Sequence, residues 1–395
     1  MVALKSLKKI NKRKKNISLK KRLSAISLKR ISNSLVKSRN TVKSQYKLSL
    51  NKNFSYRLMN PAELRVCNLR KAFRNEEKLK YKLDKCYDYD NPAVQKYLTD
   101  RLKSEFTIEH VSNVIAPKQI DGNCWFNAMF MMFFISDRGR IFFRHLRQLM
   151  IEGRTDNTSI SDVRLKNAFA LLNFIVECCM TGNKLAKSLN TNKIIKQIHE
   201  LTKEKGISTP NIGEAGNPIH YYHNLENYLI KEALPEALPG LNERSNPIKY
   251  YNSLINYLGD RELKLVTLNS YTWKSDLNAY INNPPHVIII ESKPRISNKS
   301  VKKNLQFSLG NYIYALDSAS VIDNGREHFC SLVTCNGIQF AFDGYSKSRL
   351  VPFEWKTLIN ENADWDFKDY IYEFETETIW NFTVGYSCLC YYRIV

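Results

Sequence analysis

The sequence predicts an α+β protein in which a helical N-terminal half packs on a C-terminal, largely antiparallel sheet. Apolar residues recur at helical spacing through much of residues 61–205, whereas short β-branched and aromatic runs follow one another from Pro284 onward. Asn336-Gly337 separates two of these runs, and Asn-Gly between apolar runs is the strongest short-range signal for a β-hairpin. Because the helices precede the strands in one chain, separate helical and sheet layers are favoured.

The individual elements follow from the same periodicities. Helical spacing predicts helices over residues 61–85, 92–106, 124–135, 141–152, 161–180 and 183–205. Cys178 and Cys179 stand in an apolar row and are expected to be core residues, whereas the arginines of 138–147 make their helix basic. Strands are expected at residues 286–290, 311–316, 328–335, 338–342, 370–374 and 383–393, with a short helix at 353–362.

A duplicated segment lies between these halves. Residues 217–230 recur as residues 246–259, with nine of fourteen positions identical at an offset of 29 residues. Two copies are too few for a solenoid, so each is interpreted as a short helix, begun by proline, with exposed tyrosines that could grip a partner. A metal site at His220 and His223 is disfavoured, because the second copy has Lys249 and Asn252 at these positions.

The positive charge of the chain is concentrated at its start. Residues 1–47 contain sixteen Lys and Arg and no Asp or Glu, so subtracting them from the net charge of +22 leaves about +6 for the rest. Their apolar content is too low for a core, which predicts a disordered basic tail over residues 1–55. We expect residues 1–47 to act as a nuclear-targeting address or to bind nucleic acid or an anionic surface, with a solvated charge run as the alternative.

The nine cysteines show no CxxC pairs with zinc spacing, and no secretory leader is apparent. Free intracellular thiols, in the nucleus or cytoplasm or in a virion, are therefore expected, with no metal and no cofactor. The chain also has no apolar run long enough to span a membrane.

Cys124 is the candidate nucleophile. The turn residues Asp121-Gly122-Asn123 precede it and an apolar run follows it, so Cys124 should open a buried helix. The positive end of a helix stabilises a thiolate, which is the nucleophilic form of cysteine. Gln119 could donate its side-chain amide to an oxyanion, and Gly122 gives backbone N–H groups room to approach a carbonyl. The alternative is an ordinary buried cysteine.

His328 and Asp343 are the candidate base and its orienting acid. His328 begins the first strand of the hairpin around Asn336-Gly337, and Asp343 ends the second strand, so both should lie at the same end. A carboxylate beside a histidine fixes its tautomer, and that histidine can take the proton of a thiol. A surface histidine after a turn is the alternative interpretation of His328.

These residues resemble a known family. The order Cys, His, Asp, with the nucleophile on a helix and the other two on a sheet, is similar to papain-like cysteine peptidases. Within them, residues 314–316, 321–325, 328–333, 340–344 and 350–351 resemble the histidine box and catalytic Asp of ubiquitin-specific proteases. The cysteine loop 121–124 looks more like that of the ovarian-tumour (OTU) deubiquitinases, which makes Asp121 an alternative acid. The resemblance covers residues 117–135 and 284–352, and the CxxC pairs that bind zinc in ubiquitin-specific proteases are absent.

The resemblance implies a papain-like fold and a cysteine hydrolase that cleaves peptide or isopeptide bonds, most simply a deubiquitinase acting on conjugates of ubiquitin or a ubiquitin-like protein. Processing of another precursor, such as a viral structural protein, is a further possibility. The chain would then comprise the basic tail 1–55, a helical extension 56–110 and a catalytic domain 111–395 with a helical insertion around 205–260. The alternative is an inactive papain-like fold that holds nucleic acid or has a structural role.

Overall fold

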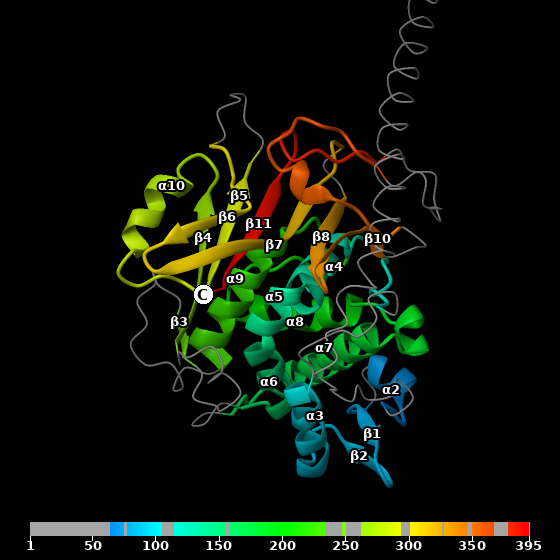
Figure 1. Cartoon of the computed structure of the whole chain (residues 1–395). Coiled ribbons are helices and arrows are strands. Elements are labelled where there is room, and N and C mark those ends of the chain that lie inside the picture. The colour runs from blue at the N-terminus through cyan, green and yellow to red at the C-terminus, as the bar shows by residue number, and fades with distance from the viewer. Residues whose placement is uncertain are drawn as a thin grey trace, which may run out of the picture.

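The computed structural model describes residues 64–74, 77–104, 114–154, 159–233, 247–249, 262–293, 301–325, 328–345, 350–366 and 378–394. In these ranges a group of helices packs on one face of a large mixed sheet (Figure 1), so the expected α+β class is confirmed. The predicted basic tail, the predicted strand 370–374 and residues 250–259 of the second repeat lie outside the described residues.

The helices follow the predicted periodicity in the central part of the chain, except that the helix expected over 183–205 is interrupted at residues 189–191 and the helix expected over 353–362 is only a 3-10 turn at residues 355–357. The α-helices are α2 (Leu69–Phe73), α3 (Pro92–Ser104), α4 (Cys124–Phe130), α5 (Asp137–Phe142), α6 (Arg144–Glu152), α7 (Val163–Thr181), α8 (Asn192–Glu204), α9 (Pro218–Tyr228) and α10 (Trp273–Asp276). Short helical turns are η3 (Met131–Ile135), η4 (Lys184–Ser188), η5 (Leu229–Ala233), η8 (Leu277–Tyr280) and η9 (Trp355–Thr357). The helix that begins at Cys124 thus runs to Ile135, as predicted, but its second half is the π-helical turn η3.

The large sheet has nine strands in the order β10-β9-β8-β7-β11-β5-β4-β3, with β6 paired to β7 beside β8. The strands are β3 (Pro247–Lys249), β4 (Glu262–Asn269), β5 (Val287–Ser292), β6 (Gln306–Leu309), β7 (Tyr312–Ile322), β8 (Phe329–Cys335), β9 (Ile338–Phe342), β10 (Leu350–Pro352) and β11 (Ser387–Arg393). Asn336 and Gly337 connect β8 to β9 with positive φ at both residues, as the hairpin prediction requires. Among these pairs only β4 and β5 run parallel, a pair that the strand pattern did not predict.

Both faces of the sheet are buried, because side chains alternate between two apolar cores. On β5, Val287 and Ile289 join the core shared with the helices, whereas Ile288 and Ile290 face a second core on the other side. That second core contains Trp273, Trp355, Trp365 and Trp380. Continuous apolar runs such as 287–290 are typical of strands covered on both faces.

The N-terminal extension differs from prediction. The helix expected over residues 61–85 is wrong: of the residues described there only α2 is helical, and β1 (Lys80–Lys82) and β2 (Cys86–Asp88) form a separate hairpin. Tyr81 alone on β1 is buried, where its ring meets Phe174 at 6.1 Å. The pattern Lys-Tyr-Lys has the period of a strand, and this local alternation outweighs the helical spacing around it. The helix expected at 92–106 is present as α3.

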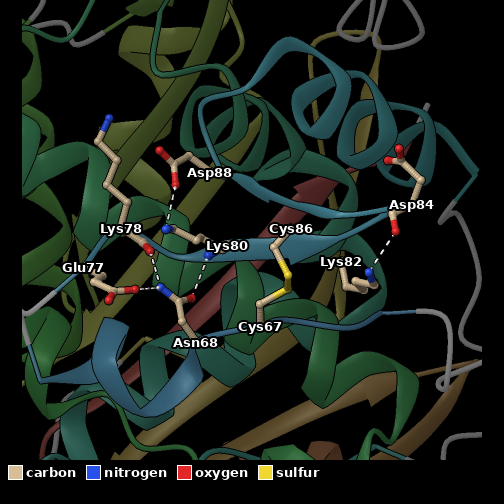
Figure 2. Close-up of a disulfide and its surroundings, with 9 residues drawn as sticks. All are labelled: Cys67, Asn68, Glu77, Lys78, Lys80, Lys82, Asp84, Cys86 and Asp88. Atoms are coloured by element: carbon tan, nitrogen blue, oxygen red, sulfur yellow. Dashed lines mark hydrogen bonds and ion pairs between the residues drawn. A yellow bond between two sulfur atoms is a disulfide. The ribbon is translucent and has the colours of Figure 1, made fainter.

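A disulfide between Cys67 and Cys86 ties this hairpin to the segment before α2 (Figure 2), so the expectation that all nine cysteines are free thiols is wrong. The pairing was not evident from spacing, because it depends on the hairpin that brings Cys86 beside Cys67. The Asn68 side chain reinforces the same contact by bonding Glu77, the Lys78 carbonyl and the Lys80 amide. In Figure 1, β1 and β2 lie at the end of the helical layer away from the large sheet.

A buried charged cluster binds the extension to the helical layer. Glu177 of α7, which is 0% exposed, accepts from Arg101 of α3 at 3.0 Å and from Arg147 of α6. Arg140 and Arg144 are also buried. The basic helix predicted over 141–152 therefore directs most of its arginines inward, where carboxylates and backbone carbonyls accept hydrogen bonds from them.

The described residues of the insertion around 205–260 are only partly helical. The first repeat forms α9 with Asn217 as N-cap and Pro218 in the first turn, as predicted. Its tyrosines Tyr221 and Tyr222 are buried, so the expectation of exposed tyrosines is wrong for this copy. The second repeat begins with β3, which pairs with β4. The shared Pro-Ile pair lies in a helix in the first copy, where α9 packs on α4, and in a strand at the sheet edge in the second copy, because tertiary context overrides weak local propensity.

Candidate active site

The cysteine loop ends in the helix start that the turn residues predict. Asp121 and Gly122 have φ values of 50° and 75°, and α4 begins at Cys124, which is 5% exposed. The left-handed pair reverses the chain so that the first helical N–H groups face the end of the loop. Cys124 therefore lies at the positive end of α4, where a thiolate is stabilised.

A buried amide network holds this loop in place. The Asn123 side chain accepts from the Ile120 backbone N–H at 3.0 Å and donates to Thr191 at 3.1 Å and to Asn192 at 2.8 Å. Thr191 in turn donates to Asn127 one turn into α4. Because buried polar groups in a closed network have few alternative arrangements, the loop before Cys124 is fixed against the start of α8.

Residues 213–216 form a wall beside the nucleophile loop. The Gly213 amide donates to the Asp121 carbonyl at 2.9 Å, and a Cβ on Gly122 would lie 3.5 Å from the Gly213 backbone. A Cβ on Gly216 would lie 2.4 Å from the indole of Trp125, so only glycine allows this backbone to lie on the ring. Gly213 and Gly216, unlike Gly122, were not identified from the sequence.

The hairpin brings His328 and Asp343 together. His328 immediately precedes β8 and Asp343 immediately follows β9, and the two strands pair in register from Cys335 with Ile338 to Ser331 with Phe342. His328 Nε2 lies 2.5 Å from Asp343 Oδ1, with both side chains at most 8% exposed. The His328 backbone N–H also donates to Asp323 at 3.0 Å. Asp343 therefore holds the proton on Nε2 and leaves Nδ1 of a neutral ring as an acceptor.

Cys124, at the start of α4 in the helical layer, contacts His328, which immediately precedes β8 in the sheet layer. α4 packs directly on β8 (Figure 1), and Cys124 is hydrogen bonded to His328. Burial lowers the pKa of His328. The hydrogen bonds to Asp343 and Cys124 and the charge interactions with the same two residues have the larger combined effect, so that the pKa is raised from 6.5 to about 9. His328 is therefore placed to take the proton of the Cys124 thiol.

Gln119 lies beside the Nδ1 atom of the imidazole. Its Nε2 is 3.2 Å from His328 Nδ1. A Cβ on Gly344 would lie 1.9 Å from Gln119 Oε1, so glycine at 344 is required for the amide to occupy this position. The predicted oxyanion donor is thus beside the predicted base, next to the ring nitrogen that Asp343 leaves unoccupied.

The alternative acid Asp121 lies elsewhere. Its carboxylate is exposed and accepts from the Asn192 side chain at 3.3 Å. Of the two candidate acids, Asp343 is the one hydrogen bonded to His328 in this structure.

Two aromatic residues near His328 were missed from the sequence. The Tyr345 ring stacks on the imidazole at 4.4 Å and 23°, and the Trp380 indole lies 5.8 Å from it at 54°. Tyr345 stands two residues after Asp343, a proximity that could have identified it. Trp380 is distant in sequence from every other site residue, and no sequence signal marks it.

The other free cysteines in the described part of the chain are buried core residues. Burial raises the pKa of the thiols of Cys178, Cys330 and Cys335, the last to about 12. Apolar burial makes such thiols poor nucleophiles, which separates them chemically from Cys124. Cys178 and Cys179 are both 0% exposed, which agrees with the core position predicted for them.

Within the residues that the structure describes, no group of three or more His, Cys, Asp or Glu side chains is arranged to hold a metal ion. His223 instead contacts the Thr267 hydroxyl at 2.8 Å, and His220 lies 3.8 Å from Glu291. Across the same residues, no helix has the length and apolar character needed to cross a membrane.

Comparison with known proteins gives only remote likeness. No family model matches the chain, and no curated protein matches it. Among solved structures, a crystal structure of an essential yeast splicing factor is similar with a TM-score of 0.40 and 12% identity, covering 72% of this chain and 71% of that one. A SAGA DUB module bound to monoubiquitin is similar with a TM-score of 0.42 and 10% identity, covering 92% of this chain and 96% of that one.

Proposed function

We propose that this protein is a cysteine-dependent hydrolase that cleaves peptide or isopeptide bonds, with deubiquitination as its activity. One observation carries the proposal: His328 is hydrogen bonded to Asp343 through Nε2 and to Cys124, which opens helix α4. Nucleophile, base and orienting acid thus form one connected chain of the kind that activates a thiol. The three residues come from two separate layers of the fold.

The first chemical step is attack by the thiolate. His328 takes the thiol proton on Nδ1, and the Cys124 sulfur adds to the carbonyl carbon of the scissile bond. The Cys124 backbone N–H and the Gln119 amide donate to the oxyanion that forms, after Gln119 turns from Nδ1 toward the substrate. The imidazolium then protonates the leaving amine, and the C–N bond breaks to give a thioester on Cys124.

The second step removes the acyl group. Water replaces the amine beside His328, which now takes a proton from that water while oxygen attacks the thioester carbonyl. Collapse of the second tetrahedral intermediate expels the Cys124 thiolate and releases a carboxylic acid. Asp343 keeps Nε2 protonated throughout, so that Nδ1 serves both as acceptor and as donor.

The small exposed fraction of the Cys124 and His328 side chains favours a slender substrate. Cys124 is 5% exposed and His328 is 6% exposed, so a chain end with small side chains reaches the sulfur more easily than a bulky internal segment. This agrees with the substrate that the resemblance to ubiquitin-specific proteases implies, a conjugated ubiquitin or ubiquitin-like protein. Residues 1–47 would add an electrostatic attachment to nucleic acid or an anionic surface.

A ubiquitin whose C-terminus carries an electrophile tests the proposal. We expect it to label the full-length protein, with the adduct on Cys124 by peptide mapping. Cys124→Ser should abolish labelling, whereas Cys178→Ser, which alters a core thiol, should retain it. Absence of labelling in the folded wild-type protein, together with salt-sensitive binding of nucleic acid, would favour the inactive nucleic-acid-binding alternative.

A further inference from the structure

Tyr345 has three contacts that converge on the reacting groups. Its ring stacks on the His328 imidazole at 4.4 Å and 23°, and its backbone N–H donates to Asp343 Oδ1 at 3.1 Å. Its side chain is hydrogen bonded to Gln119.

The contacts restrain three different motions. Stacking on the ring face opposes rotation of the imidazole about its bond to Cβ, since a turn of the ring would break the parallel contact. The backbone hydrogen bond shares Oδ1 with His328 Nε2 and so fixes the carboxylate that selects the tautomer. The bond to Gln119 limits how far the amide can move from the site.

The turn that carries Tyr345 has no room for a side chain at Gly344. A Cβ at this position would lie 2.7 Å from the Gln119 Cβ as well as 1.9 Å from its Oε1. The segment Asp343-Gly344-Tyr345 therefore lies directly against Gln119 while Tyr345 covers His328. On another side of the imidazole lies Trp380, a fully buried residue at a ring distance of 5.8 Å.

We propose that Tyr345 is a positioning residue, which holds the His328 ring so that Nδ1 faces Cys124 and holds Gln119 within reach of the oxyanion. The inference rests on the proposed function, because it concerns the same thiol, base and amide. The two parts of the Tyr345 side chain have separate roles: the ring supports formation of the Cys124–His328 ion pair, and the hydroxyl places Gln119. Charged and titratable groups that face this assembly are Cys124, Asp323 and Asp343.

Two substitutions separate the two parts. Tyr345→Phe keeps the stacked ring and removes the bond to Gln119, whereas Tyr345→Leu removes the ring as well. Tyr312→Leu is the matched control, because Tyr312 is a partly buried tyrosine at the far end of β7 from the residues paired with β8. If Tyr345→Leu does not fold by circular dichroism, Tyr345→Gln removes the ring with a polar side chain.

The first readout is alkylation of Cys124 by a haloacetamide across pH, mapped by mass spectrometry, which reports thiolate and needs no substrate. We expect Tyr345→Phe and Tyr312→Leu to retain the wild-type profile within about twofold, and Tyr345→Leu to react about tenfold more slowly near neutral pH with a displaced midpoint. The second readout is hydrolysis, in which Tyr345→Phe should lower kcat with little change in KM.

An unchanged alkylation profile in Tyr345→Leu, or an equal loss in Tyr312→Leu, would overturn the positioning role and leave Tyr345 a structural residue. Unchanged kcat in Tyr345→Phe would overturn the role of its hydroxyl. Failure of the proposed function looks different, because the wild-type Cys124 would then show an ordinary thiol profile and no hydrolysis.

Discussion

His328 Nε2 lies 2.5 Å from Asp343 Oδ1, because His328 immediately precedes β8 and Asp343 immediately follows β9 at the same end of the hairpin. Because the carboxylate occupies Nε2, the remaining nitrogen is the one available to Cys124 and Gln119. This arrangement ranks the two candidate acids. Asp343→Asn should lower kcat by about 10²-fold or more by freeing the tautomer, whereas Asp121→Asn, whose carboxylate contacts Asn192, should change kcat by less than about threefold.

Steady-state hydrolysis of a ubiquitin C-terminal amide by both variants checks this ranking. A larger loss in Asp121→Asn than in Asp343→Asn would transfer the role of the acid to the cysteine loop, as in the OTU-like interpretation.

The pH dependence follows from His328. Its pKa is raised from 6.5 to about 9, so the imidazolium persists as pH rises and is lost only through about pH 9. We therefore expect kcat/KM to decline on the basic side near this value. Because the folded-state pKa lies above the unfolded one, the linked stability is fully present below about pH 6.5 and is lost as pH rises through about 9.

The pH profile of kcat/KM, with unfolding by urea at matched pH values, measures both effects. In His328→Gln the alkaline loss of stability from this group should disappear. A basic limb in the wild type near pH 6.5 would show that the contacts to Asp343 and Cys124 do not hold the proton.

Gly344 is predicted to act through Gln119. The Cβ of Gly344→Ala would overlap Gln119 Oε1 at 1.9 Å and displace the amide, so kcat should fall by about tenfold to a hundredfold. Gln119→Ala should have a similar effect, since it removes the donor itself. In the double variant the two losses should not add, because the added methyl group has no amide left to displace. Full additivity in the double-mutant cycle would mean that Gly344 acts on another group.

Glu177 is predicted to be a stability determinant remote from the site. Glu177→Gln removes a carboxylate that two buried arginines share, which should cost about 3–5 kcal/mol of unfolding free energy. Glu204→Gln is the control, since its ion pair with Arg164 is about half exposed and should contribute less than about 1 kcal/mol. Urea midpoints at equal m-values give the comparison, and equal shifts in the two variants would contradict the account.

The basic tail is predicted to be separable from catalysis. Deletion of residues 1–47 removes sixteen positive charges but no candidate site residue. Turnover of a small substrate should remain within about twofold, while binding to nucleic acid or anionic lipid should be lost, and in the intact chain should weaken steeply with salt. Salt-sensitive binding that survives the deletion would place the relevant charge within the rest of the chain.

The sequence predicted the parts of this fold that depend on local pattern. The start of α4 at Cys124 follows from turn chemistry, and the β8–β9 hairpin follows from Asn336-Gly337, so the placement of Cys124, His328 and Asp343 on these elements was accessible from local signals. The parallel pairing of β4 with β5 could not be predicted in this way, because no local signal in β4 indicates which strand it pairs with. Parallel pairs depend on tertiary context that one segment does not encode.

The disulfide and the aromatic contacts of His328 show the same limit. Cys67 and Cys86 can pair because residues 80–82 form a strand of the β1–β2 hairpin, where the apolar spacing had predicted a helix. Trp380 lies far from the histidine box in sequence and reaches His328 through a β-bridge with Asp323. Such contacts arise from the assembled fold, and composition and spacing do not reveal them.

The central claim is that His328 activates Cys124, and the rate of Cys124 alkylation as a function of pH tests it most directly. In the wild-type protein, haloacetamide should modify Cys124 rapidly already near pH 6, because His328 is hydrogen bonded to Cys124 and can take its thiol proton, which leaves the reactive thiolate. In His328→Gln the rate near pH 6 should fall by about tenfold or more and rise only as the unassisted thiol ionises. Equal rates at every pH in the two proteins, with Cys124 in both titrating as an ordinary thiol, would contradict the account.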